Sequence, residues 1–131
     1  MKYLLLIYGN QENWEHPLFV RHPDFLALPA GEQEELTRQA AALRRELTES
    51  GELLGGEALA DSVTGRTVRV RAGVPVVTDG PYVEAKEQLA GYIVVDCADL
   101  ERASEIAARI PDARFTAVEV RPIVDLSGQE M

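Results

Sequence analysis

The feature that most restricts the fold is one long stretch of helical periodicity placed between short strand-like runs. In residues 31–50, apolar side chains recur with the spacing of an amphipathic helix, at Leu36, Ala40, Leu43 and Leu47. Acidic residues at the start of this stretch complement the helix dipole, and Gly51 is positioned to end the helix. Such a helix must cover an apolar surface, and the strand-like runs on either side of it supply one.

The strand-like runs differ in their pattern of apolar residues, and therefore in where each strand is expected to lie in a sheet. Residues 2–8 are apolar on both faces of a period-two pattern, as in a central strand. The run 53–59 is interrupted by Gly55-Gly56, which indicates a bulge or a close backbone approach. Further strands are predicted at 91–95 and 117–123, separated by a second helix that Asp99 caps and Pro111 ends.

A β-hairpin is predicted at residues 67–78. Its first strand places Val68 and Val70 on one face and polar residues on the other, and Ala72-Gly73 supplies the turn. Pro75 lacks a backbone N–H and therefore indicates that the second strand lies at an edge.

The order of these elements predicts an α+β fold. Strand, helix, strand, strand, helix, strand is the βαββαβ pattern of a ferredoxin-like sandwich, here with the hairpin inserted between its halves. Both helices would cover one face of the sheet, while Tyr92, Val94 and the first strand leave the other face apolar. A homodimer packed sheet against sheet would cover that face. We expect a single domain over residues 1–126 and a C-terminal tail over 127–131.

Composition excludes several classes of function. With 46% hydrophobic and 27% charged residues, the chain has the make-up of a soluble globular protein. Its net charge of -9 opposes binding to a phosphate backbone, so no nucleic-acid partner is expected. The apolar run at the N-terminus stops at Gly9, too short for a membrane segment. Cys97 is the only cysteine, which fits the cytoplasm and a buried apolar role better than a disulfide or a reactive thiol.

Ionisable residues gather in the segment 78–92, around the turn Asp79-Gly80-Pro81. We take Asp79, Lys86 and Tyr92 as the candidate catalytic residues, with Asp79 as a general base or orienting carboxylate and Tyr92 as a hydrogen-bond donor. The candidate substrate-binding residues, which would hold an anion with Lys86 or frame it, are Arg121, Glu84, Arg69 and Arg71.

Each of these residues also has a structural explanation. The triplet Asp79-Gly80-Pro81 is a good turn sequence in its own right, because glycine permits positive φ. The charged side chains would form surface ion pairs, which contribute little to stability. Tyr92 would pack in the core.

Two histidines and the only tryptophan fall in a proline-rich stretch at residues 9–29. His16 and His22 would act as a general base or as metal ligands, or else fill ordinary loop roles. No partner lies at the spacing of a metal site, so we expect no metal and no cofactor. Trp14 would hold the loop against the body or roof a pocket.

Several segments together resemble one family. The motif Asp79-Gly80-Pro81-Tyr82 stands at the centre, and the other matching segments are residues 1–8, 55–59, 67–71, 83–87, 91–92 and 118–122. In this arrangement the chain is similar to the YCII-related, or DGPF-domain, family of bacterial proteins, with Tyr82 where the family usually has phenylalanine. The resemblance implies a ferredoxin-like fold that dimerises into an α/β barrel with a cleft.

For function, the resemblance implies several alternatives. Some relatives carry a histidine and aspartate pair suspected of acid/base chemistry, one branch includes a dehydrochlorinase-type enzyme, and many members are described as sigma-factor-associated. His16 and His22 match no such pair by position. We expect a homodimer that binds a small anionic organic molecule in its cleft, with lyase or isomerase-like acid/base chemistry. The alternatives are a non-catalytic module that contacts a sigma-factor-associated partner, and a motif with a purely structural role.

Overall fold

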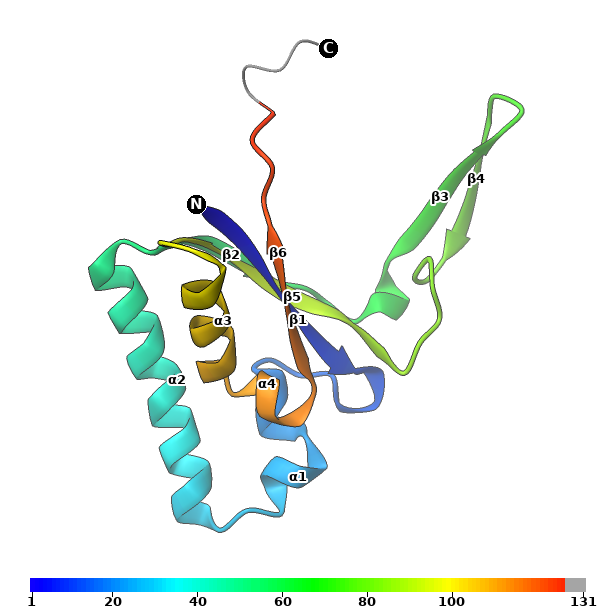
Figure 1. Ribbon diagram of the computed structural model, residues 1–131. Coiled ribbons are helices and arrows are strands. Elements are labelled where there is room, and N and C mark those ends of the chain that lie inside the picture. The colour runs from blue at the N-terminus through cyan, green and yellow to red at the C-terminus, as the bar shows by residue number, and fades with distance from the viewer. Residues whose placement is uncertain (127–131) are drawn as a thin grey trace.

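The computed structural model describes residues 1–126, which form an open antiparallel sheet, helices on one of its faces and a separate hairpin (Figure 1). The strands are β1 (Lys2–Asn10), β2 (Leu53–Ala58), β3 (Arg66–Arg71), β4 (Val74–Asp79), β5 (Glu87–Asp96) and β6 (Ala117–Pro122). The helices are α1 (Pro23–Leu26), α2 (Ala30–Ser50), α3 (Leu100–Arg109) and α4 (Asp112–Phe115). The α+β class is therefore confirmed, and the single chain forms no closed barrel over its described length.

The main sheet has the strand order β2-β5-β1-β6, and every neighbouring pair is antiparallel. The prediction that residues 2–8 form a central strand is confirmed, because β1 pairs with β5 on one side and with β6 on the other. In this register Leu5 lies opposite Ile93 and Val120, so that alternate residues of three strands share one face.

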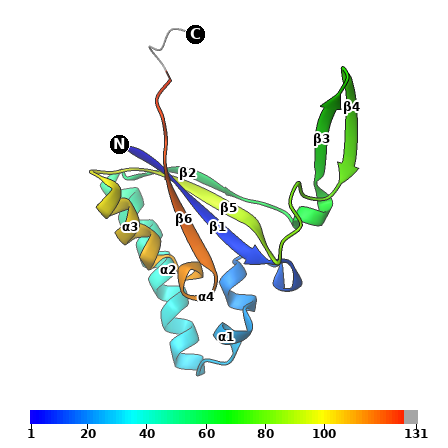
Figure 2. The same cartoon turned by 45° about the vertical axis from the view of Figure 1, so that its right-hand side comes forward.

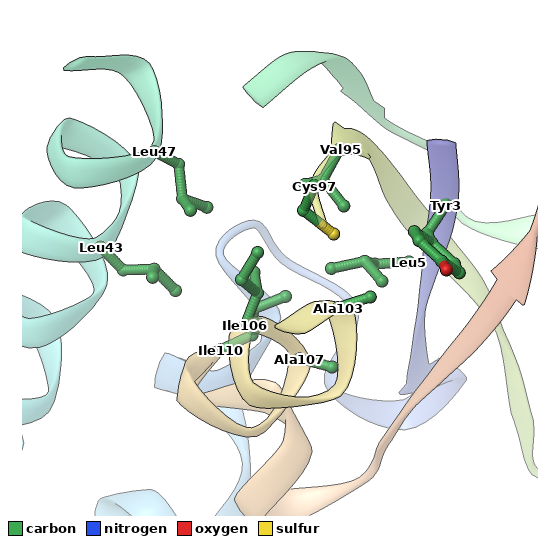
Figure 3. Packing of buried hydrophobic residues seen from close by; sticks show 10 residues of the cluster. All are labelled: Tyr3, Leu5, Leu43, Leu47, Val95, Cys97, Ala103, Ile106, Ala107 and Ile110. Atoms are coloured by element: carbon green, nitrogen blue, oxygen red, sulfur yellow. The ribbon is translucent and has the colours of Figure 1, made fainter. Parts of the chain in front are cut away.

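Helices α2 and α3 pack across one face of this sheet (Figures 1 and 2). The buried cluster between the layers consists of Tyr3, Leu5, Leu43, Leu47, Val95, Cys97, Ala103, Ile106, Ala107 and Ile110 (Figure 3). The expected apolar role of Cys97 is thus confirmed. Leu36 and Ala40 are only partly buried, because the first half of α2 extends beyond the sheet (Figure 1).

The predicted helix ends are confirmed by their backbone geometry. Gly51 ends α2 with φ of 80°, a left-handed conformation that favours glycine. The Asp99 side chain accepts a hydrogen bond from the backbone N–H of Arg102, at 2.9 Å, and so caps α3.

An ion pair ties α3 to the connection between α2 and β2. The Arg102 guanidinium donates two hydrogen bonds to the Glu52 carboxylate, Nε to Oε2 at 2.9 Å and Nη2 to Oε1 at 2.8 Å. The hydrogen bond from Arg102 lowers the pKa of Glu52 from its ordinary 4.5 to about 2. The carboxylate is therefore held in its charged form well into the acid range.

The structure differs from the prediction in two segments, and a third predicted segment is not described. Strand β5 begins at Glu87 rather than at residue 91, since the buried Gln88 amide donates to the carbonyls of Val83 and Ala85 and fixes the preceding loop. Helix α4 was not predicted, because four residues are too few for a periodic pattern. The predicted tail at 127–131 lies outside the described residues.

Two adjacent glycines in β2 allow a matched test of close strand packing. A Cβ atom on Gly56 would lie 2.5 Å from the backbone oxygen of Tyr92, whereas one on Gly55 would meet nothing within 4 Å. We expect Gly56→Ala to lower the free energy of unfolding by about 1–3 kcal/mol, and Gly55→Ala to change it by less than about 0.5 kcal/mol. Urea denaturation measures both, and equal effects would contradict the predicted close approach.

The pair of Glu52 with Arg102 predicts a pH dependence of stability. Because the folded-state pKa of Glu52 is depressed, its contribution is fully present above pH 4.5 and is lost as the pH falls toward about 2. Glu52→Gln should therefore cost about 1 kcal/mol at neutral pH and progressively less in acid. Urea denaturation across this range, with the exposed Glu49→Gln as control, tests the prediction. A cost that does not shrink in acid would count against it.

Candidate functional site

A cavity of about 610 Å³ opens beside strands β2 and β5. Small residues of these strands line it, namely Gly55, Gly56, Ala58, Ala90 and Gly91. The absence of large side chains at these positions leaves room between the strands, α2 and the loop that follows β1. Pro17 and Leu18 of that loop complete an apolar wall.

Ionisable side chains from three separate elements meet at this cavity. His16 comes from the loop after β1, Arg44 from α2, and Asp112 from the start of α4. Residues so far apart in the chain are brought together only by the fold. Convergent polar groups in a largely apolar hollow are typical of ligand sites.

The Asp112 side chain is buried, with only 9% of the residue exposed. Burial raises the pKa of Asp112 above its ordinary value, while its backbone hydrogen bonds and the nearby His16 charge act in the opposite direction. This carboxyl group therefore keeps its proton to a higher pH than a surface aspartate does. Groups tuned in this way are suited to proton transfer.

The ring of His16 is held by the end of the β2 segment. Its Nε2 lies 2.6 Å from the carbonyl oxygen of Leu59, and a carbonyl only accepts, so Nε2 carries the proton. In the neutral ring Nδ1 is then left as a proton acceptor. The indole Nε1 of Trp14 donates to the same carbonyl at 3.2 Å, and its ring meets that of His16 edge-on at 6.1 Å. Trp14 thus anchors the loop that carries His16.

Arg44 supplies the cavity with a positive charge. Its guanidinium takes part in no ion pair with the rest of residues 1–126, although other arginines of the helices do, as Arg102 and Arg109 show. An uncompensated guanidinium at a cavity is a natural partner for a carboxylate or phosphate.

The predicted catalytic residues do not converge within one subunit. Tyr92 is among the residues at the cavity, but it lies opposite Leu6 in the sheet register, so its side chain is on the face that the helices leave open. Asp79 lies at the end of β4 with its side chain 90% exposed, 3.5 Å from Arg66, and it does not line the cavity. Lys86 and Glu84 lie exposed in the loop that leads to β5, also away from the cavity.

The predicted substrate-binding arginines are distributed over two further places. Arg69 and Arg71 belong to β3, where the guanidinium of Arg69 lies 4.9 Å from the ring centre of Tyr82. Arg121 lies in β6, 3.5 Å from Glu119, on the face of the sheet that the helices leave open. That side of the sheet is opposite the core.

The turn at Asp79-Gly80-Pro81 stabilises the base of the β3–β4 hairpin. Gly80 has φ of 93°, its N–H donates to the Gly65 carbonyl at 2.8 Å, and its own carbonyl accepts from Thr67 Oγ1 at 2.9 Å. These bonds close the base of the β3–β4 hairpin.

Sequence reasoning missed Arg44 and Asp112 and left His16 without a partner. One feature of the sequence could have pointed to Asp112. It is a carboxylate between the apolar residues Pro111 and Ala113, directly after the apolar stripe of α3. Arg44 gives none, because it resembles any arginine on the outside of an amphipathic helix.

Within residues 1–126, no three histidine, cysteine or carboxylate side chains come close enough together to hold a metal ion. In the same part of the chain, no helix combines the length and apolar character needed to cross a membrane.

Comparison with known proteins places the chain among relatives. The model of the YCII-related domain matches residues 1–127. An uncharacterised protein of Rhizobium meliloti (strain 1021) is 36% identical over 94 residues, which cover 70% of this chain and 76% of that relative. The match runs through both the cavity strands and the motif around Asp79. On this evidence the chain belongs to the YCII-related family.

Proposed function

We propose that the cavity beside β2 and β5 binds a small anionic organic molecule and that His16 and Asp112 exchange protons with it. The observation that carries this proposal is the meeting of the unpaired Arg44 guanidinium with a histidine and a buried carboxyl in one cavity. Its volume of about 610 Å³ lies within the range of small-molecule sites.

The three side chains would divide the work. Arg44 would hold the anionic group of the substrate, which fixes its orientation. His16 would take a proton through Nδ1, while Asp112, whose pKa burial raises, would exchange a proton elsewhere on the same molecule. Removal and return of a proton in this way is the core of lyase and isomerase steps.

We also propose that the subunit is a ferredoxin-like sandwich and that two copies form a dimer. The strand order and the two long helices on one face support a ferredoxin-like sandwich, with the β3–β4 hairpin as an insertion. Leu4, Leu6 and Val94 share the face that no helix covers. We propose that a second copy covers it, sheet against sheet, as a dimeric barrel would.

The segment around Asp79 is a second location for the same function. In the dimer, Asp79, Lys86 and Arg121 would border a cleft between the two copies, where Glu84, Arg69 and Arg71 would frame the ligand. The exposure of Lys86 and the place of Arg121 on the open face support this location. The hydrogen bonds of Gly80 support instead a purely structural motif.

Thermal shift with small carboxylates and phosphates tests the binding proposal. A ligand at about 100 times its dissociation constant should stabilise the protein by about 2.7 kcal/mol. We expect Arg44→Gln and His16→Gln to lose this gain and Asp79→Asn to keep it, because only the first two residues line the cavity. If only Asp79→Asn loses the ligand-induced stabilisation, the binding site lies at the turn and not in the cavity. The absence of a shift with every compound would remove the support for binding.

The raised pKa of Asp112 predicts that this residue costs stability as the pH rises. Since the folded state keeps the proton longer than the unfolded state does, stability falls from the ordinary pKa of 3.8 upward. Asp112→Asn should therefore gain stability relative to the wild type between pH ~4 and pH ~7. Urea denaturation at both pH values measures the difference, with Asp24→Asn as the exposed control. A difference that does not change with pH would contradict the burial argument.

A further inference from the structure

The β3–β4 hairpin stands apart from the body of the protein. Its two strands form a sheet of their own, and they rise on the side of the main sheet that the helices do not cover (Figures 1 and 2). Its base is held by the Gly80–Gly65 backbone bond, by Thr67 and by the ion pair of Arg66 with Asp79. These contacts hold the two strands together at the base of the hairpin.

One face of this projection is apolar and unpartnered. The register sets Val68 opposite Val77 and Val70 opposite Pro75, so that these four residues share one side, here called the valine face. The exposed fractions of Val68, Val70 and Val77 are 60%, 66% and 50%. A two-stranded hairpin by itself is marginally stable in water, and a cluster of exposed valines on it indicates a contact surface.

The opposite face differs in character. Arg69 lies opposite Val76, and Arg71 lies opposite Val74. Tyr82 of the same chain already stacks against Arg69. The opposite face thus combines valines with arginines, whereas Val68, Val70 and Val77 of the valine face are each at least half exposed and have no arginine between them.

Charge favours a second copy of the chain as the occupant. Residues 66–79 contain three arginines and one aspartate, whereas the whole chain has a net charge of -9. A basic arm on an acidic body is attracted to another such body. The arginines and Pro75 also discourage open-ended strand pairing, which favours a closed pair over a fibre.

We propose that the β3–β4 hairpin is a dimer arm whose valine face docks on a second copy, beside the uncovered face of its main sheet. This inference rests on the dimer proposed above and adds a contact that sheet-to-sheet packing alone does not include. By two-fold symmetry each copy would give one arm and receive one.

Two valines make a matched pair for the test. Val70 lies on the valine face with 66% exposure, and Val74 lies on the other face with 61% exposure. In sedimentation equilibrium, Val70→Asp should raise the dimer dissociation constant about 10-fold or more, and Val74→Asp should leave it within about 2-fold. Circular dichroism of both variants establishes that the body remains folded.

Limited trypsin digestion gives a second readout. The bond after Arg71 lies at the tip of the arm, so it should be cut slowly in the wild-type dimer and at least about 10-fold faster in Val70→Asp. Equal behaviour of the two valine variants, or no change in either, would overturn the proposed arm.

A third variant separates the arm from the dimer itself. Leu6→Arg places a charge on the uncovered face of the main sheet. If Leu6→Arg dissociates the dimer and Val70→Asp does not, the dimer stands and the arm proposal falls. If the wild type is monomeric at all concentrations and trypsin cuts its arm rapidly, the proposal that a second copy binds the valine face is wrong. The partner of that face would then be a different protein. Ligand binding by the cavity is measured separately by thermal shift, so its failure cannot be confused with that of the arm.

Discussion

Strand β1 has to satisfy two environments at once, and the rest of the structure is arranged around that requirement. Because side chains alternate along a strand, Tyr3 and Leu5 enter the core below α2 and α3, while Leu4 and Leu6 emerge on the other side. A strand apolar on both faces cannot leave one of them in water without cost. The helices meet half of this requirement within the chain. The other half is the physical basis of both the proposed dimer and its arm.

The elements that follow from local chemistry could be predicted from the sequence. The periodic stripe of α2, the glycine that ends it and the aspartate that caps α3 are all decided by nearby residues. The Gly55-Gly56 pair likewise predicted the close approach of β2 to its neighbouring strand β5. Helix α4 and the early start of β5 could not be predicted, since they depend on tertiary contacts such as those of Gln88.

The candidate site was harder to predict, for a related reason. A turn with clustered charges is visible in the sequence, so attention falls on Asp79, Lys86 and their neighbours. The cavity instead combines His16, Arg44 and Asp112, which lie in three distant segments and are unremarkable in each of them. What makes Asp112 chemically distinct is its burial, and burial is a property of the fold. The hydrogen bonds of Gly80 show that a prominent motif can first of all serve to shape the chain.

The carbonyl of Leu59 links the only tryptophan of the chain to the candidate site, because it receives both the Trp14 indole and the His16 ring. An indole so placed is a built-in optical probe. Its emission depends on the charge of the neighbouring imidazole and on water entering the loop, so ligand arrival and histidine titration can be followed in solution without attaching a dye. The same spectral signal would report detachment of the loop from the Leu59 carbonyl.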